Sequence, residues 1–226
     1  KVGAFALTEP GAGSDASAAK TKAISDGDDY IINGTKCFIS NMGPEEGDYV
    51  VLIALTDPSA GTKGMSAIVV DRNTPGFSVG KLENKMGLRG ANVSELIFQD
   101  CRVPKSNLLG KEGEGFKIAM ATLDGGRIGV AAIALGIAQG AINETIKYVG
   151  ERKQFGKTIG SFQNTKFKLA ELQAKVDAAR LLVWRAACAK DNHEPISTYA
   201  AMAKLVCSDV ANETTRTCVQ LFGGYG

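Results

Sequence analysis

The feature that most constrains the fold is a change in the spacing of apolar residues near Gly110. Before this point the apolar residues form short runs separated by glycine and proline, which is typical of β-strands joined by turns. Beyond it they recur every three or four positions over long stretches, which is typical of helices. The sequence therefore predicts an α+β chain with two domains, a β domain over residues 1–110 and a helical domain over residues 111–226.

The β half contains several runs of strand length. Tyr30–Ile32 leads into Asn33-Gly34, a dipeptide typical of hairpin turns, and Thr35–Ser40 is the expected returning strand. Further strands are expected where β-branched and apolar residues lie between turn residues, over Val2–Leu7, Tyr49–Leu55, Met65–Asp71, Phe77–Leu82 and Val93–Phe98. Many short strands of this kind predict an antiparallel barrel or sandwich.

The helical half contains three periodic segments. Helices are expected over Phe116 to about Tyr148, over Phe162 to about Lys190, and from near Pro195 to Gly223-Gly224, whose glycines would end the last helix. Apolar residues occupy more than one side of these segments. Because such a helix in a small domain often packs against another subunit, the sequence predicts a homo-oligomer.

The composition excludes several classes of protein. The chain has 26 Lys and Arg against 24 Asp and Glu, a net charge of +2, and no basic block of the kind that binds nucleic acid. The longest charge-free stretch of the helical half, residues 128–143, is short for a membrane span. Five cysteines without a C-x-x-C pair indicate reduced thiols in an intracellular protein, and a single histidine, His193, makes a metal site unexpected.

A polar, glycine-rich turn follows the first expected strand. Pro10 fixes one backbone angle, while Gly11 and Gly13 permit angles and close approaches that other residues forbid. Thr8 and Ser14 bring hydroxyl groups to the same turn. Such a turn can wrap a flat or phosphorylated ligand with its backbone N–H groups, and taken alone it fits an ordinary surface loop equally well.

The rest of the sequence favours the ligand. Residues 6–15 resemble the first signature of the acyl-CoA dehydrogenase family, and Gln220–Gly226 resembles the start of the second. Between them, family-like motifs occur in the family order at Lys85–Gly90, Val103-Pro104 and Glu151–Gly156. The resemblance spans nearly the whole chain, and the stretch Leu123–Gly129 is most similar to the short-chain, butyryl-CoA branch.

The resemblance implies bound FAD. Contacts to its isoalloxazine ring would come from two segments, the glycine-rich turn with the strand before it and the end of the returning strand Thr35–Ser40. The residues are Phe5, Ala6, Leu7, Thr8, Glu9, Pro10, Gly11, Ala12, Gly13, Ser14, Phe38, Ile39 and Ser40. The Ser40 hydroxyl and backbone N–H would bond near flavin N5 and O4 and stabilise negative charge as the ring is reduced. Many relatives have Trp at the position of Phe38, so this chain keeps the aromatic face and lacks the indole N–H.

The resemblance also implies a second group of FAD contacts. The dinucleotide half would be bound from a neighbouring subunit by Arg152, Gln163, Gln220, Leu221, Phe222, Gly223 and Gly224. An arginine can pair bidentately with a pyrophosphate. From the residues alone, a solvated loop around Arg152 and an ordinary glycine cap at the helix end are the favoured interpretations.

Acyl-CoA substrate contacts are implied for Ser14 and for Asp124, Gly125, Gly126 and Arg127, although an acid at a helix start paired with a nearby base is also an ordinary structural feature. The family reaction needs a carboxylate of raised pKa over the substrate Cα. Relatives place it either at the position of Gly126 or beyond the Gln220–Gly224 motif. We therefore expect the catalytic Glu to lie beyond residue 226, in a chain that is an inactive fragment and also lacks the family's N-terminal helical domain.

The function implied for the parent protein is FAD-dependent α,β-dehydrogenation of an acyl-CoA to the trans-2-enoyl-CoA, as in fatty acid β-oxidation. Electrons would pass to an electron-transfer flavoprotein, and the enzyme would be a dimer of dimers in the bacterial cytoplasm or the mitochondrial matrix. Three alternatives stay open: an acyl-CoA oxidase, a non-catalytic flavin- or CoA-binding module, and an oligomerisation module.

Overall fold

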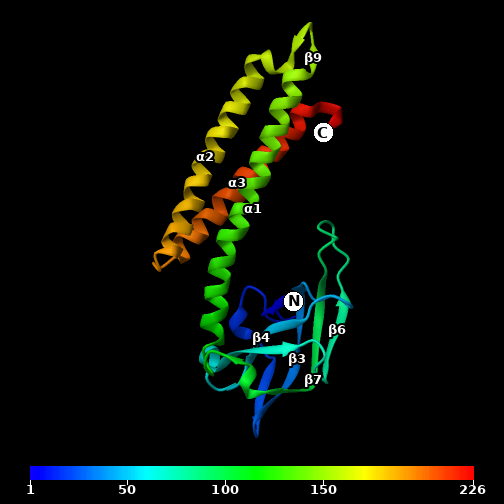
Figure 1. The fold of residues 1–226 in the computed structure, drawn as a ribbon, viewed down its shortest axis with the longest axis vertical. Coiled ribbons are helices and arrows are strands. Elements are labelled where there is room, and N and C mark those ends of the chain that lie inside the picture. Colours follow the sequence, from blue (N-terminus) through cyan, green and yellow to red (C-terminus); the bar gives the residue numbers. More distant parts are fainter. The chain divides into compact units, whose positions relative to one another are not determined.

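The computed structural model describes all 226 residues, which form two compact units, Lys1–Ala121 and Thr122–Gly226 (Figure 1). The first unit contains the sheet strands β1 (Gly3–Ala6), β2 (Lys22–Asp26), β3 (Asp29–Ser40), β4 (Tyr49–Leu55), β5 (Met65–Asp71), β6 (Phe77–Leu82), β7 (Val93–Pro104) and β8 (Leu108–Leu109). Helix α1 (Gly115–Glu151) begins in the first unit and continues in the second. The α+β class predicted from the sequence is confirmed.

The eight strands form one mixed sheet. The strand order is β6-β7-β3-β2-β4-β5-β8, and β1 pairs with β4 outside this path. Most pairings are antiparallel, but β1 runs parallel to β4, and Lys22 of β2 pairs in parallel with Leu55 of β4. The sheet is thus not wholly antiparallel, because β1 and β4 are joined by a long segment rather than by a tight hairpin turn.

The hairpin predicted at Asn33-Gly34 is wrong. Strand β3 continues through both residues, and the turn to its neighbour lies at Gly27-Asp28, where Asp26 of β2 pairs with Asp29 of β3. Gly34 is required for a steric reason instead, because a Cβ on this residue would lie 2.4 Å from Oγ1 of Thr21. Gly34 therefore allows the loop before β2 to approach β3, at an irregularity in the β3–β7 register.

The second unit is a helical bundle with a small hairpin. It contains the rest of α1, the short strands β9 (Lys153–Gln154) and β10 (Lys157–Thr158), and helices α2 (Gln163–Asp191) and α3 (Ser197–Phe222). All three predicted helices are confirmed to within a few residues. As predicted, the last one ends at Gly223, which takes a left-handed φ of 63°.

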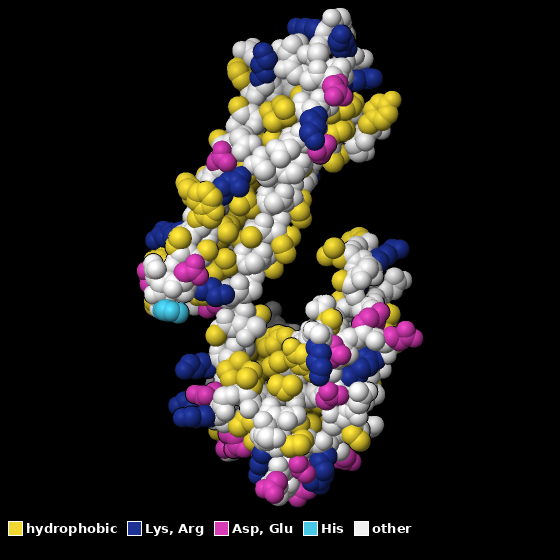
Figure 2. All heavy atoms as spheres, viewed as in Figure 1, with side chains coloured by type: hydrophobic (Ala, Val, Ile, Leu, Met, Phe, Trp, Pro, Cys, Tyr) yellow, Lys and Arg dark blue, Asp and Glu magenta, His cyan; other side chains and the backbone are white.

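Small residues dominate the core of this bundle. Its fully buried positions include Ala138 of α1, Ala179 and Ala186 of α2, and Ala203 of α3. Small side chains let helices pack closely, and the larger apolar residues then remain outside. In Figure 2 apolar side chains are spread over the visible face of the helical unit. The large apolar residues exposed on α1 are Val130, Ile133, Ile137 and Ile146.

Helix α1 is long and apolar enough to cross a membrane. Its most apolar window has a mean hydropathy of 1.5, and 17% of that window is buried within the structure. Length and hydropathy alone do not separate a membrane helix from a helix of a bundle core. In this chain α1 packs through Ala131, Leu135 and Ile142 against the other two helices.

Candidate functional site

Strand β4 determines where the polar turn after β1 lies, because two different strands pair with one of its sides. One side of β4 is paired along its whole length with β5, from Tyr49 to Leu55. Strands β1 and β2 share the other side, and the segment between them leaves the sheet at this point. Glu9 and Ala12 then close the turn through two backbone hydrogen bonds of 3.0 and 3.1 Å.

The glycines of this turn face open space. A Cβ added at Gly11 or Gly13 would meet no atom within 4 Å. Nothing in the chain therefore requires these glycines for a close internal contact. Glycines in such a position let a ligand approach the backbone N–H groups directly. Ser14 is exposed beside them, and Thr8 is half-buried.

The predicted second ring-contact segment forms a β-bulge. The register between β3 and β7 shifts between Lys36 and Ile39, and Phe38 has a φ of +58°. A left-handed conformation of this kind is unfavourable for a bulky residue and is often found at functional sites. The Phe38 side chain is 65% exposed, so the bulge turns an aromatic ring outward instead of into the core.

The turn and the bulge lie side by side. The backbone N–H of Cys37 donates a 3.0 Å hydrogen bond to the carbonyl of Thr8. This bond joins positions that are 29 residues apart in sequence, and it brings the residues predicted as ring contacts in the turn next to those predicted in β3. Phe5 is half-buried in β1, Ile39 is buried in β3, and Ser40 is exposed at the end of β3.

A buried ion pair lies beneath this junction. The Lys36 Nζ is 2.8 Å from Oε1 of Glu9 and also donates a 2.9 Å hydrogen bond to the carbonyl of Leu7. The Glu9 carboxylate in addition accepts hydrogen bonds from the backbone N–H groups of Lys20 (2.7 Å) and Thr21 (3.0 Å). The carboxylate of Glu9, one of the residues predicted to contact the flavin, is thus engaged inside the protein.

Burial and pairing act in opposite directions on these two groups. Burial alone would raise the pKa of the Glu9 carboxyl, but the hydrogen bonds from Lys36, Lys20 and Thr21 together bring that pKa below its usual value. Burial lowers the pKa of Lys36, and the neighbouring Glu9 opposes that shift. We conclude that Glu9 is ionised at neutral pH, because three donors converge on its oxygens.

Lys36 is the residue that the sequence analysis missed. In β3 the buried side chains of Tyr30 and Ile32 have even numbers, and Ile39, past the bulge, has an odd number. Alternation alone places Lys36 on the same inner face as Ile32. A charged residue at a core position of a strand, with an acid in the adjacent turn, was the available signal.

The helical unit carries the second group of predicted FAD contacts. Arg152 is exposed just before the β9–β10 hairpin, and its guanidinium lies 5.9 Å from the centre of the Tyr225 ring. Tyr148 and Phe222 stack at 4.3 Å, and the Tyr148 hydroxyl donates a hydrogen bond to the Phe222 carbonyl. These contacts bring Arg152 close to the Gly223-Gly224 turn, where an added Cβ would meet nothing within 4 Å.

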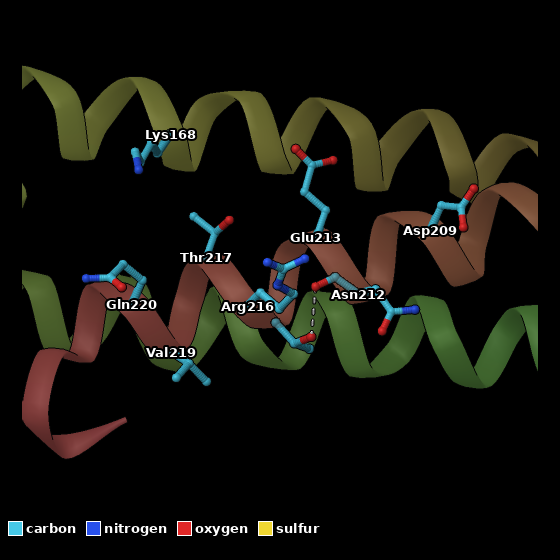
Figure 3. A pocket seen from close by; sticks show the side chains of 9 residues that line it. Lys168, Asp209, Asn212, Glu213, Arg216, Thr217, Val219 and Gln220 are labelled. Carbon is cyan, nitrogen blue, oxygen red and sulfur yellow. Dashed lines mark hydrogen bonds between the residues drawn. The ribbon is translucent and has the colours of Figure 1, made fainter.

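Two other predicted residues of this group lie nearby in the fold. Gln163 is exposed at the first position of α2. Gln220 lines an open groove of about 830 Å³ between α2 and α3, together with Lys168, Glu213 and Thr217 (Figure 3). The structure thus brings the arginine and the C-terminal turn together, and places Gln163 at the start of the helix that follows the β9–β10 hairpin.

The predicted substrate-contact residues of the helical half lie well inside α1 and not at its start. Asp124 and Arg127 form an ion pair one turn apart, and the Ser197 hydroxyl at the beginning of α3 donates to Asp124. Their alternative role as a structural ion pair therefore has observed partners. A Cβ on Gly126 would meet nothing within 4 Å, so the surface beside this pair is open.

Two family models match the chain. The acyl-CoA dehydrogenase middle domain covers residues 4–101, and the acyl-CoA dehydrogenase C-terminal domain covers residues 113–226. The chain belongs to the acyl-CoA dehydrogenase family. Members of this family are FAD-dependent flavoproteins that oxidise a carbon–carbon single bond.

Similar proteins cover both units of the chain. An acryloyl-CoA reductase (NADH) of Anaerotignum propionicum is 55% identical over all of this chain and 57% of its own length. The butyryl-CoA dehydrogenase structure from Megasphaera elsdenii is 51% identical, with a TM-score of 0.95, over 100% of this chain and 58% of that one. A chain from a structure of the electron transferring flavoprotein of Acidaminococcus fermentans is 57% identical, with a TM-score of 0.94, over 99% and 58%. The chain thus spans under three fifths of these relatives.

The residues of the first unit fit a flavin. An acyl-CoA dehydrogenase needs a surface for a flat aromatic ring whose edge carries hydrogen-bond acceptors and donors. The open glycine turn supplies unhindered backbone N–H groups, Ser14 and Ser40 supply exposed hydroxyls, and Phe38 supplies an exposed aromatic face. These groups come from two adjacent segments that are hydrogen-bonded to each other.

Proposed function

We propose that the whole protein is a short-chain acyl-CoA dehydrogenase that converts an acyl-CoA to its trans-2-enoyl-CoA. The observation that carries the proposal is the junction of the glycine turn with the Phe38 bulge, held together by the Cys37–Thr8 hydrogen bond. The similar Megasphaera elsdenii protein is a butyryl-CoA dehydrogenase, which supports a short acyl chain.

FAD, when bound, supplies the acceptor for the hydride that leaves the β-carbon of the substrate. We assign its ring to Phe5–Ser14 and Phe38–Ser40. Thr8, Ser14 and Ser40 would hydrogen-bond the polar edge of the ring, and the exposed Phe38 would cover one face. Dipoles fixed before the reaction stabilise developing negative charge more effectively than water that must reorient.

We assign the dinucleotide half of FAD to the helical unit of a neighbouring subunit. Arg152, Lys153 and Lys157 give the β9–β10 hairpin a positive charge, and the adjacent Gly223-Gly224 turn is open to a ligand. Gln163, Gln220, Leu221 and Phe222 complete the assignment. A guanidinium beside an open glycine turn suits a pyrophosphate. This arrangement requires a homo-oligomer, for which we propose the dimer of dimers.

We propose Ser14 and the Asp124–Arg127 segment as acyl-CoA contacts, and none of the carboxylates described here as the general base. A base that removes an α proton near neutral pH needs a raised pKa. The pKa of Glu9 is lowered by its hydrogen bonds, against the effect of burial, and that of Glu171 is lowered by the hydrogen bond from Lys175. Both shifts run in the wrong direction for a base.

A second candidate is the reverse reaction, reduction of a 2-enoyl-CoA. The specific observation in its favour is the 55% identity to an acryloyl-CoA reductase. One site can perform both directions, because the same groups stabilise the same transition state. The electron donor or acceptor would be an electron-transfer flavoprotein, the partner that the name of a 51% identical reductase subunit from Acetobacterium woodii includes.

The test uses purified full-length protein. We expect a yellow protein whose flavin absorbance bleaches on addition of butyryl-CoA and returns with an electron-transfer flavoprotein. A matched addition of crotonyl-CoA to chemically reduced protein tests the reverse direction. A protein that binds flavin but never bleaches would contradict the proposal and indicate a binding module. Reoxidation of the flavin by oxygen as fast as by the electron-transfer flavoprotein would indicate an oxidase.

A further inference from the structure

The buried ion pair of Glu9 and Lys36 has no part in the proposed chemistry. The Lys36 side chain is fully buried and that of Glu9 is 7% exposed, so neither charge can touch a ligand. Removing two charges from water is unfavourable, and well-packed apolar residues at such positions often give equal or greater stability. A pair of this kind calls for a reason other than stability.

The geometry of the pair supplies that reason. The ammonium group comes from the strand that forms the bulge, two residues before Phe38, and it binds both Glu9 and the carbonyl of Leu7 at the base of the turn. The carboxylate binds the backbone of Lys20 and Thr21, where the segment returns to the sheet. Both ends of the turn segment are thus tied to one atom pair beneath the bulge.

Apolar contacts have no preferred direction, so they would not fix the position of the turn relative to β3. The turn carries its open glycines on the outside, and the backbone hydrogen bond that joins it to β3 is the one from Cys37 to Thr8. Charged hydrogen bonds are directional and short, so they specify both distance and orientation. Sites of this kind must hold their groups to within about 0.5 Å of the productive geometry.

We propose that the Glu9–Lys36 pair is a positioning clamp for the flavin site, which holds the Thr8–Ser14 turn against the Cys37–Phe38 bulge so that both face one ring. The inference rests on the proposed function. It gives the side chains of Glu9 and Lys36 the role of positioning groups that act through Thr8, Ser14 and Phe38.

The decisive variant is the double substitution Glu9→Gln with Lys36→Met in the full-length, FAD-loaded protein. Gln keeps a carbonyl that can accept from the loop backbone, and Met keeps the length of the lysine stem without its charge. No unpaired charge is left buried, so the protein should fold. Its matched control is Arg102→Met, which removes an ion pair with Asp26 and Asp29 on the same sheet, at the far end of β3 and β7.

Three quantities are measured: the rate of FAD release, the absorption spectrum of the bound flavin, and the midpoint of thermal unfolding. For the double variant we expect an unfolding midpoint near that of the wild type, a changed flavin spectrum, and FAD release about tenfold faster, the size of effect expected from one lost charge-assisted hydrogen bond. Arg102→Met should release FAD at the wild-type rate.

An unchanged spectrum and release rate in a folded double variant would overturn the clamp and leave the pair a structural feature. If the double variant does not fold, Glu9→Asp decides, because it keeps the charge and withdraws the carboxylate by one methylene. The clamp predicts faster FAD release for Glu9→Asp, and wild-type release would overturn it. A wild-type protein that holds no FAD would instead refute the proposed function itself.

Discussion

The two units of the molecule fill their interiors with different chemistry. The β unit buries an ion pair and a tyrosine among its apolar side chains, and the lysine of the pair lies two residues before the left-handed Phe38. The core of the helical unit combines alanines with leucine, isoleucine and valine residues, and its charged side chains lie on the outside. The interior of the β unit contains directional polar interactions, whereas the interior of the helical unit is close-packed and largely apolar.

This difference separates two tasks. Directional bonds fix where a turn and a bulge stand relative to each other, which a catalytic site needs. Small core residues draw helices together and leave large apolar residues such as Ile137, Trp184 and Leu205 exposed, which suits contact with another chain. Four substitutions test whether the two interiors behave differently.

The largest effect is expected from Lys36→Met alone. It leaves the ionised Glu9 carboxylate buried without its partner, which typically costs about 3–5 kcal/mol of folding free energy. Denaturant unfolding of the full-length protein measures the loss. Exposed Arg102→Met serves as the control and should unfold like the wild type. Equal unfolding of both variants would show that the buried charge is hydrated and that the β interior is less directional than we infer.

A smaller loss is expected from Ala179→Leu in the helical core. Ala179 is fully buried, and its carbonyl lies 3.7 Å from the Cys207 sulfur of α3, so the added methyl groups would push α2 and α3 apart. Overpacking of this kind usually costs about 1–3 kcal/mol. The neighbouring Ala178 is exposed, and Ala178→Leu is the matched control for denaturant unfolding. A tolerated leucine at position 179 would contradict close packing of the bundle.

Tyr30→Phe tests a second directional bond of the β unit. The buried Tyr30 hydroxyl donates to the Glu112 carboxylate, and its loss should cost about 1 kcal/mol at neutral pH.

Burial, together with the hydrogen bond to Glu112, raises the pKa of Tyr30 to about 12 from its usual 10. The unfolded chain releases this proton first, so the contribution is complete below pH 10 and is lost as the pH rises towards 12. Stability measured across this range should fall more steeply for the wild type than for Tyr30→Phe, and parallel curves would contradict the bond.

The sequence predicts those parts of the fold that depend on local pattern. Runs such as Met65–Asp71 and Phe77–Leu82 lie between turn residues, and the structure has strands over the same residues. Gly223 ends α3 because glycine tolerates the left-handed φ required there. The failures are non-local. The parallel pairing of β1 with β4, and the role of Gly34 as a point of close approach to Thr21, depend on contacts that no local pattern encodes.

The candidate site also has a part that local pattern predicts and a part that depends on non-local contacts. The glycine turn could be found from its residues, because Gly11, Gly13 and the hydroxyls are a local pattern. The inward direction of the Glu9 carboxylate could not, since it depends on Lys36, 27 residues away. Strand parity does place Lys36 inside, but only a bulge lets Ile39 face the same core, and the bulge is visible only in the pairing with β7.

The smallest effect on folding, and a large one on assembly, is expected from Ile137→Ser. Ile137 is 55% exposed at a shallow groove formed with Ala134, Ala211 and Thr215, so its loss removes little buried surface within one chain. Exposed substitutions usually change stability by less than about 0.5 kcal/mol. If this face meets another subunit, sedimentation of the full-length protein should show weaker assembly, while Lys147→Ser on the same helix should have no effect. Since the dinucleotide contacts are proposed to come from the neighbouring subunit, FAD should be lost together with assembly. An assembled Ile137→Ser protein with full FAD content would remove this face of α1 from the interface and leave the exposed apolar residues of α2 and α3 as the alternative.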